Sequence, residues 1–452
     1  MGTVDVAVRS PRASLALLAT GQLMLIIDGT GVAVALPRVR DELGLAGAQL
    51  SWVVNGYLVA FGGLLLLCGR VGDLVGRRRV FLAGIAVFTA ASAVCGVAGT
   101  GAVLVAARFA QGAGGALAGS VITGMAVVLF PDGRARVRAI TVLAFVAAAG
   151  GSVGALGGGA LTQAFGWRSV FLVNLPIGVL LLVFGRRVLA PERGTGWGAG
   201  ADLFGGALVT AGLMLLVLGI GELGPDGPGT WLPPVLVGAG VVLLVAFVVR
   251  QARAGNPLLP LGMFTSRALS GGNAVQALFV GAMFGFQYLV TLYLQEVLGL
   301  TSLETGLAYL LASAVIGAVT LGAAQRLIVR WGARGVLLAG LAAGLLSFGW
   351  LVRVPAGGGF ALDVLPAMVV LGVSAGLVLP AATALAMTGA AEADSGLRSA
   401  LSGTAQQVGG ALGLAVLAAF AGAGYRWGFA AGAVLLVLAG LLVLAVLRRE
   451  HG

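Results

Sequence analysis

The stretch Gly69-Arg-Val-Gly-Asp-Leu-Val-Gly-Arg-Arg-Arg-Val80 places four arginines, three glycines and one carboxylate in twelve consecutive positions. Long apolar runs flank it on both sides, from Leu50 to Cys68 and from Val80 to Ala98. At about 1.5 Å of rise per residue, each run is long enough as a helix to cross a hydrocarbon layer of about 30 Å. Glycine permits the backbone conformations of a short turn, and arginines are retained on the cytoplasmic side of a membrane. The stretch therefore predicts a tight turn between two membrane-spanning helices.

The composition extends this interpretation to the whole chain. Of its 452 residues, 59% are hydrophobic and 10% are charged, and the mean hydropathy is +1.06. These values lie far from those of soluble globular proteins. The formal net charge of +11 comes from arginines that lie in small groups between apolar runs. That pattern is typical of membrane topology rather than of nucleic-acid binding, so we expect a multi-pass membrane protein with no nucleic-acid partner.

The apolar runs predict an all-α integral membrane protein with fourteen transmembrane helices. A basic stretch at Gly322 to Gly335 partly repeats the first one, so we expect two pseudo-symmetric six-helix bundles plus two extra linker helices. The predicted units are residues 14–189, 190–265 and 266–447. An even number of spans puts both termini on one side, and the arginines indicate the cytoplasmic side. The predicted spans are 14–36, 50–68, 80–98, 102–130, 139–162, 167–184, 203–220, 231–249, 269–294, 305–324, 336–352, 364–389, 399–420 and 427–447.

Two charged residues lie inside predicted spans. Asp28 is about 21 Å along the first span from Ser14, and Arg108 is about 9 Å into the fourth span from its outer end. Because both then lie in the outer half of the membrane, we expect them to be near one another or to share a polar network. Placing an ionisable group inside a membrane span costs free energy, and such groups commonly have a functional role. This favours a proton-carrying role for Asp28 over a purely structural ion pair.

The first stretch resembles the signature loop between the second and third helices of the major facilitator superfamily, G-x-L-x-D-x-x-G-R-[KR]-x. Gly69, Asp73, Gly76, Arg77 and Arg78 match that pattern. The resemblance implies a gating loop on the cytoplasmic side. We expect Asp73 to face the positive end of a neighbouring helix, at the start of the thirteenth span near Leu397.

Further segments resemble the 14-helix drug:proton antiporters of that superfamily. Asp28-Gly-Thr-Gly-Val-Ala-Val-Ala-Leu-Pro37 is similar to their first-span motif D-x-T-x-V-N-V-A-L-P, with Ala33 at the asparagine position. Arg108 and Gln111 match the fourth-span motif R-x-x-Q-G. The resemblance implies proton coupling through Asp28, Arg108 and Gln111. Segments at 167–178, 293–299 and 404–413 are similar to other conserved parts of the group.

The fifth span is similar to the antiporter motif G-x-x-x-G-P-x-x-G-G, with Ala155 in place of the proline. Glycines four residues apart allow helices to approach closely whatever the function. We therefore expect helix packing at Gly150, Gly154, Gly158 and Gly159.

The ninth span combines polar, aromatic and methionine side chains near one helical face. Flexible methionine and flat aromatic groups beside a few polar ones suit bulky, weakly specified ligands. Ordinary hydrogen bonding between helices explains the polar residues equally well. The candidate substrate-binding residues are Asn273, Gln276, Met283, Phe284, Gln287, Tyr288 and Thr291.

The resemblance to the drug:proton antiporters implies proton-coupled efflux of hydrophobic or cationic organic compounds by alternating access, and we expect this in a bacterial plasma membrane. The expected partners are a small-molecule substrate, protons and the lipid bilayer. A dedicated exporter of one self-made metabolite and a non-transporting membrane sensor or scaffold are the alternatives. An enzyme is disfavoured: Gly372-Val-Ser-Ala-Gly376 fits a hydrolase pattern, but the only histidine is His451. No metal site or cofactor is expected.

Overall fold

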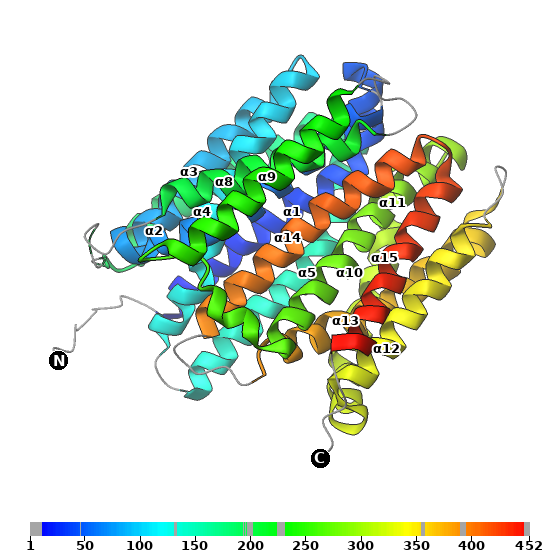
Figure 1. Ribbon diagram of the computed structural model, residues 1–452. Helices are drawn as coiled ribbons and strands as arrows, with labels where there is room; N and C mark the ends of the chain where they lie inside the picture. Colours follow the sequence, from blue (N-terminus) through cyan, green and yellow to red (C-terminus); the bar gives the residue numbers. More distant parts are fainter. Residues whose placement is uncertain are drawn as a thin grey trace.

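The computed structural model describes residues 11–45, 47–130, 133–192, 194, 196, 202–223, 231–353, 358–388 and 395–446. Within these ranges every regular element is a helix (Figure 1). The helices are apolar over most of their surface, and in a bilayer the backbone groups of a spanning segment must be paired internally, which a helix achieves.

The chain forms its helices in three groups. The first group is α1 (Pro11–Leu43), α2 (Gly47–Val75), α3 (Arg77–Gly96), α4 (Gly101–Leu129), α5 (Gly133–Phe165), α6 (Arg168–Leu172) and α7 (Asn174–Val188). The second is the pair α8 (Leu203–Gly221) and α9 (Leu232–Arg253). After the 3-10 turn η2 (Leu261–Thr265) comes the third: α10 (Arg267–Leu292), η3 (Tyr293–Val297), α11 (Ser302–Val319), η4 (Thr320–Ala324), α12 (Gln325–Leu351), η5 (Phe360–Val364), α13 (Leu365–Ala386), α14 (Ser395–Ala421) and α15 (Tyr425–Val446).

Thirteen helices in the described ranges are long and apolar enough to cross a membrane. One of them, Ser302–Leu351, has 50 residues, about 75 Å of helix, which is far more than one crossing requires. It contains Gly332 with φ 72° and ψ 159°, a conformation outside the helical region. The prediction of fourteen spans divides this stretch into two spans, 305–324 and 336–352, with the glycine in the segment between them. Counted by continuous helix, it is a single span.

Packing within the first and third groups is extensive, and two helix pairs supply most of the contact between the groups. α2 packs on α14, and α5 packs on α11. Glycines make the first contact close: a methyl group at Gly62 would lie 2.9 Å from Cβ of Gln407. α8 packs on both α2 and α14, so the inserted pair covers this junction (Figure 1). The proposed division at residues 189/190 and 265/266 remains a prediction.

We call the end of the bundle that carries Gly76 the loop end, and the opposite end, which carries Arg40 and Glu296, the far end. α1 finishes at the far end, beside Arg40, and α15 starts there, because Tyr425 donates a hydrogen bond to Glu296. The start of α1 and the finish of α15 therefore both lie at the loop end. This agrees with an even number of crossings.

Candidate functional site

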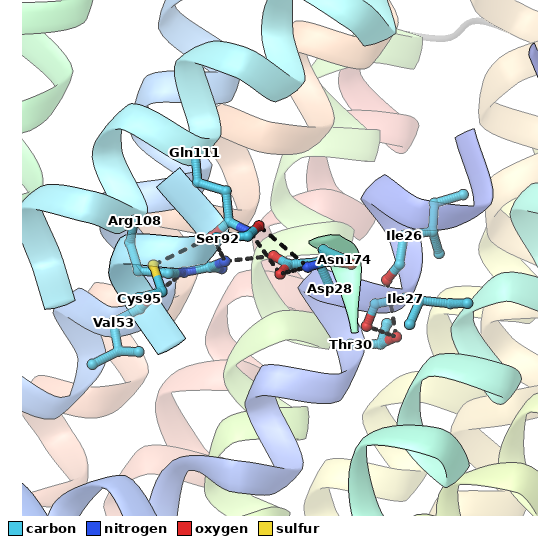
Figure 2. A network of polar contacts seen from close by, with 10 residues as sticks. All are labelled: Ile26, Ile27, Asp28, Thr30, Val53, Ser92, Cys95, Arg108, Gln111 and Asn174. Atoms are coloured by element: carbon cyan, nitrogen blue, oxygen red, sulfur yellow. Dashed lines mark hydrogen bonds and ion pairs between the residues drawn. The ribbon is translucent and has the colours of Figure 1, made fainter. Parts of the chain in front are cut away.

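A polar network lies inside the first group of helices (Figure 2). It joins Asp28 of α1, Ser92 of α3, Arg108 and Gln111 of α4, and Asn174 of α7, and each of these side chains is fully buried. Burial of a charge inside a membrane protein is tolerated only where other groups satisfy it. The hydrogen bonds within the network satisfy the two buried charges of Asp28 and Arg108.

The Asp28 carboxylate has three donors. Arg108 Nη1 lies 2.5 Å from Oδ2, while Gln111 Nε2 and Asn174 Nδ2 donate to Oδ1 at 2.7 and 2.9 Å. Ser92 Oγ accepts from Gln111 at 2.8 Å, which holds the glutamine amide in place. The carboxylate is therefore stabilised by one full charge and by two amides that come from different helices.

Arg108 is fixed from several directions as well. Its Nε donates to the carbonyl oxygen of Val53 at 2.8 Å, and its Nη1 donates to Gln111 Oε1 at 2.7 Å. The guanidinium also lies over the Tyr57 ring, 4.6 Å from the centroid, an arrangement that favours a cation. Arg108 Nη2 and Asn174 Oδ1 are buried without a hydrogen-bond partner in the described part of the chain. The network thus has unused donor and acceptor capacity.

Helical rise predicts that Asp28 and Arg108 lie near one another or share a polar network, and the structure shows them in direct contact. Gln111 belongs to the same network. Sequence reasoning did not single out Ser92 or Asn174. Asn174 lies in one of the segments similar to the antiporter group, which was a usable signal, whereas Ser92 is one small polar residue in an apolar run. A role of these residues in proton coupling remains a prediction.

The expected loop between the second and third spans is shorter than predicted. α2 continues to Val75 and α3 begins at Arg77, so only Gly76 lies outside a helix, with φ 106°. A β-carbon there would lie 2.5 Å from the carbonyl oxygen of Glu192. Both the positive φ and this close approach require glycine. The stretch is thus largely helical, because its glycines elsewhere keep ordinary helical geometry.

The charged residues of this stretch bind their neighbours at the loop end. Arg77 donates to Asp73 Oδ1 at 3.0 Å, one helical turn away, and its Nη1 lies 3.9 Å from Glu192. Arg78 donates to the carbonyl oxygen of Arg186 at the end of α7 at 2.6 Å. Gly69 lies in α2, and a β-carbon there would lie 3.8 Å from Cβ of Ser120, an ordinary contact distance. The expected neighbour of Asp73, the side chain of Leu397, lies outside the described residues.

The four glycines of the fifth span lie at close helix contacts. A β-carbon at Gly154 would lie 2.0 Å from Thr30 Oγ1, and one at Gly158 would lie 2.4 Å from Gly31 Cα, both on α1. At Gly159 it would lie 2.4 Å from the carbonyl oxygen of Ser302 in α11. At Gly150 the neighbours are Leu23 and Ile26 at 3.0–3.1 Å. α5 is thus in close contact with both α1 and the third helix group.

Three of the candidate substrate residues in α10 form hydrogen bonds with other helices of the third group. Asn273 accepts from Ser402 at 2.7 Å, Gln276 donates to Thr383 at 3.4 Å, and Thr291 pairs with the Tyr309 hydroxyl at 3.0 Å. For these three, the structure favours hydrogen bonding between helices. Tyr288 is buried, while Met283, Phe284 and Gln287 are partly exposed. The last three are the candidates that retain accessible surface.

At the far end, side chains join the first and third helix groups. Arg40 of α1 forms an ion pair with Glu296 of η3, and Gln295 donates to the carbonyl oxygen of Val34 at 2.9 Å. The side chains of Arg40 and Glu296 are both partly exposed. Sequence reasoning missed these contacts, because nothing in either local sequence indicates the other. In the conformation seen, the two groups are in contact at this end.

Residues 18–414 match the sequence profile described as Major Facilitator Superfamily. The chain belongs to the major facilitator superfamily. The expected family is thereby confirmed, and the protein is a membrane transporter rather than an enzyme. Within the described residues, no three side chains of His, Cys, Asp or Glu gather as a metal site would require.

Several relatives in this superfamily carry names that refer to antibiotics. The cephamycin export protein CmcT of Amycolatopsis lactamdurans is 39% identical over 413 residues, covering 91% of this chain and 85% of that protein. The lincomycin resistance protein of Streptomyces lincolnensis is 37% identical over 413 residues, covering 90% and 84%. Among solved structures, the POT family transporter PepTSo shares the fold with a TM-score of 0.72 at 14% identity, covering 98% of this chain and all of that one.

Proposed function

We propose that this superfamily transporter exports organic compounds, antibiotics among them, in exchange for protons across a bacterial plasma membrane. The observation that carries the proposal is the fully buried Asp28 carboxylate held by Arg108, Gln111 and Asn174. The names of the relatives, antibiotic export and resistance proteins, support the substrate class. The loop end with both termini is assigned to the cytoplasm from the distribution of arginines.

In the proposed cycle Asp28 gains a proton, which removes its attraction for Arg108. Arg108 keeps other partners in that state: the Val53 carbonyl, Gln111 Oε1 and the Tyr57 ring. The neutral carboxyl becomes a hydrogen-bond donor, and the buried Asn174 Oδ1, without a donor in the described part, is an acceptor within the same network. Protonation therefore exchanges one set of contacts among α1, α4 and α7 for another.

Alternation of the two bundles then moves the substrate site from one side of the membrane to the other. Met283, Phe284 and Gln287 of α10 are the proposed substrate contacts, since they are not fully buried. Gly76 with Asp73 and Arg77 would hold the loop end, and Arg40 with Glu296 would hold the far end.

Substrate-driven proton movement in inverted membrane vesicles tests the proposal. We expect at least one compound from a panel of cephamycin C, lincomycin, puromycin and a fluorescent organic cation to release protons from acidified vesicles that contain the protein. Vesicles without it are the control. A protein that binds one of these compounds without any proton release would be a sensor or scaffold instead.

A dedicated exporter of a single metabolite is the second candidate, favoured by relatives that are each named after one antibiotic. Drug susceptibility of a pump-deficient host that expresses the protein separates the two. Resistance to several chemically unrelated compounds indicates broad export, whereas resistance to one compound and its close analogues indicates a dedicated exporter.

We expect Glu296→Gln to increase the population that is open at the far end. The substitution removes the charge that pairs with Arg40 and weakens a contact between the two helix groups. A partly exposed pair is worth about 0.2–1 kcal/mol, so the ratio of the two conformations should change by up to about fivefold. Distances between spin labels at Arg38 and Arg426, both exposed at this end, measure the change.

Asp41→Asn is the matched control for this measurement. Asp41 also pairs with Arg40, at 3.1 Å, but lies next to it in α1, so its loss leaves the contact between the groups intact. The two native cysteines are buried and add little background labelling. Identical distance distributions for Glu296→Gln and wild type would show that the ion pair does not hold this end closed.

A further inference from the structure

The inserted helix pair α8–α9 carries a pocket at the loop end of the bundle. The segment that leads into α8 lies there, because Gly196 donates to the carbonyl oxygen of Leu74 beside Gly76. α9 returns to the same end and finishes at Arg253. The pocket has a volume of about 590 Å³ and is lined by Asp202, Phe204, Leu208, Ala246, Val249, Arg250, Arg253, Ala254, Gly255 and Asn256.

One wall of the pocket is apolar and faces outward. Phe204 is 60% exposed and Val249 is 43% exposed, and both lie at the loop ends of spans apolar enough to cross the membrane. α9 has few buried residues and turns most of its surface away from the bundle. In a bilayer this wall therefore meets lipid rather than water.

The other wall is polar and built around Asp202. Its carboxylate accepts from the Gly205 amide at 2.8 Å, from Arg250 Nε at 2.6 Å and from Gln251 Nε2 at 2.8 Å. Burial raises the pKa of this carboxyl, but the three donors lower it further than burial raises it, so the group is ionised at neutral pH. Both of its oxygens accept hydrogen bonds, and the carboxylate holds Arg250 in place.

The arginines give the pocket its positive character. Arg250 is held by Asp202 through Nε and by the Phe204 ring, 5.0 Å from the guanidinium carbon, and its side chain is 42% exposed. Its two terminal nitrogens point to no acceptor in the described ranges. Arg253 is exposed, and no residue that the structure describes pairs with it. Two arginines and one carboxylate thus line the pocket, which leaves a net positive charge.

We propose that this pocket binds the phosphate of an anionic phospholipid headgroup. A guanidinium group can donate two parallel hydrogen bonds to phosphate oxygens. Asp202 and Phe204 hold the Arg250 guanidinium in a fixed orientation before any ligand binds. The apolar wall next to the arginines suits the glycerol and the first part of an acyl chain. Basic pockets between transmembrane helices at the cytoplasmic face are suited to anionic headgroups. A free phosphate ion would make no use of the apolar wall.

Native mass spectrometry of the full-length protein in detergent tests this site. The probes are dioleoylphosphatidylglycerol, dioleoylphosphatidylcholine and inorganic phosphate, each titrated separately. We expect saturable binding of phosphatidylglycerol, weakened about fivefold by Arg253→Gln and on the order of twentyfold by the double change of Arg250 and Arg253 to Gln. Arg253→Gln leaves the Asp202 contacts intact, so it tests the site even if the double variant folds poorly.

The matched control changes Arg326 and Arg330 to Gln. Both are exposed near the start of α12, which lies at the loop end because α11 and η4 lead there from the far end. This variant loses the same charge and should bind phosphatidylglycerol as wild type does. The proposal fails if Arg253→Gln binds phosphatidylglycerol like wild type. It also fails if phosphatidylcholine or inorganic phosphate binds as tightly, since the site would then recognise any lipid or any phosphate.

Discussion

Asp28→Asn is expected to abolish proton-driven export while the protein remains folded. Asparagine has nearly the same shape but only one terminal oxygen, so it can accept either from Arg108 or from Gln111 and Asn174. It also cannot gain or lose a proton at physiological pH. Positioned proton-transfer groups contribute on the order of a hundredfold or more to rate, so we expect a loss of at least that size. Uptake of a fluorescent cation into inverted vesicles, driven by a pH gradient, measures it.

Asp41→Asn provides the control, because it makes the same change in the same helix at an exposed position. We expect wild-type uptake for that variant. Exchange of labelled for unlabelled substrate without a pH gradient should persist in Asp28→Asn, which separates loss of coupling from loss of binding. Normal gradient-driven uptake by Asp28→Asn would mean that another group carries the proton.

Arg108→Gln is expected to give the largest loss of stability. Removal of one partner of a buried ion pair leaves the other charge uncompensated, at a cost of about 3–5 kcal/mol in the free energy of unfolding. Asp28 would keep Gln111 and Asn174 as donors but lose its only cationic partner in the described structure. The contacts of the guanidinium with Val53 and Tyr57 would also be lost. Denaturation of the purified protein in detergent, followed by circular dichroism, measures the change.

The double variant with Asn at 28 and Gln at 108 should recover part of that loss, because no charge is then left buried. Its transport should stay as low as that of Asp28→Asn alone. Arg326→Gln, at an exposed position in α12, is the control and should unfold like wild type. If Arg108→Gln were as stable as wild type, the Asp28 charge would have to be neutralised by some group other than Arg108.

Several parts of the site could be predicted from the sequence because they depend on distance along a helix. The rise per residue fixes how deep Asp28 and Arg108 lie, and their similar depth predicted that they lie near one another or share a polar network. The glycines and arginines of residues 69–80 predicted a tight turn in this stretch, but they did not predict how short the turn is. Tertiary contact with Glu192 and helix continuation to Val75 reduce the turn to one residue.

Other parts depend on how each helix is rotated about its axis. Asn174 reaches Asp28, and Ser92 reaches Gln111 and Asn174, only because α7 and α3 turn those positions toward the network. Helical rise within each segment does not specify that rotation. The same holds for Asn273, Gln276 and Thr291: residue type alone fits substrate binding and interhelical hydrogen bonding equally, and only the fold supplies their partners on α14, α13 and α11.

Residue types alone indicate that the protein is helical and lies in a membrane. They also indicate its approximate spans, its family resemblance and the depth of each buried charge. Hydrophobicity and helical rise are local quantities, so a single chain without coordinates suffices for them. The partners of Asp28, the pairing of Arg40 with Glu296 and the pocket between α8 and α9 exist only in the folded protein. They arise from side-chain packing between helices distant in sequence, which the order of residues along one helix does not encode.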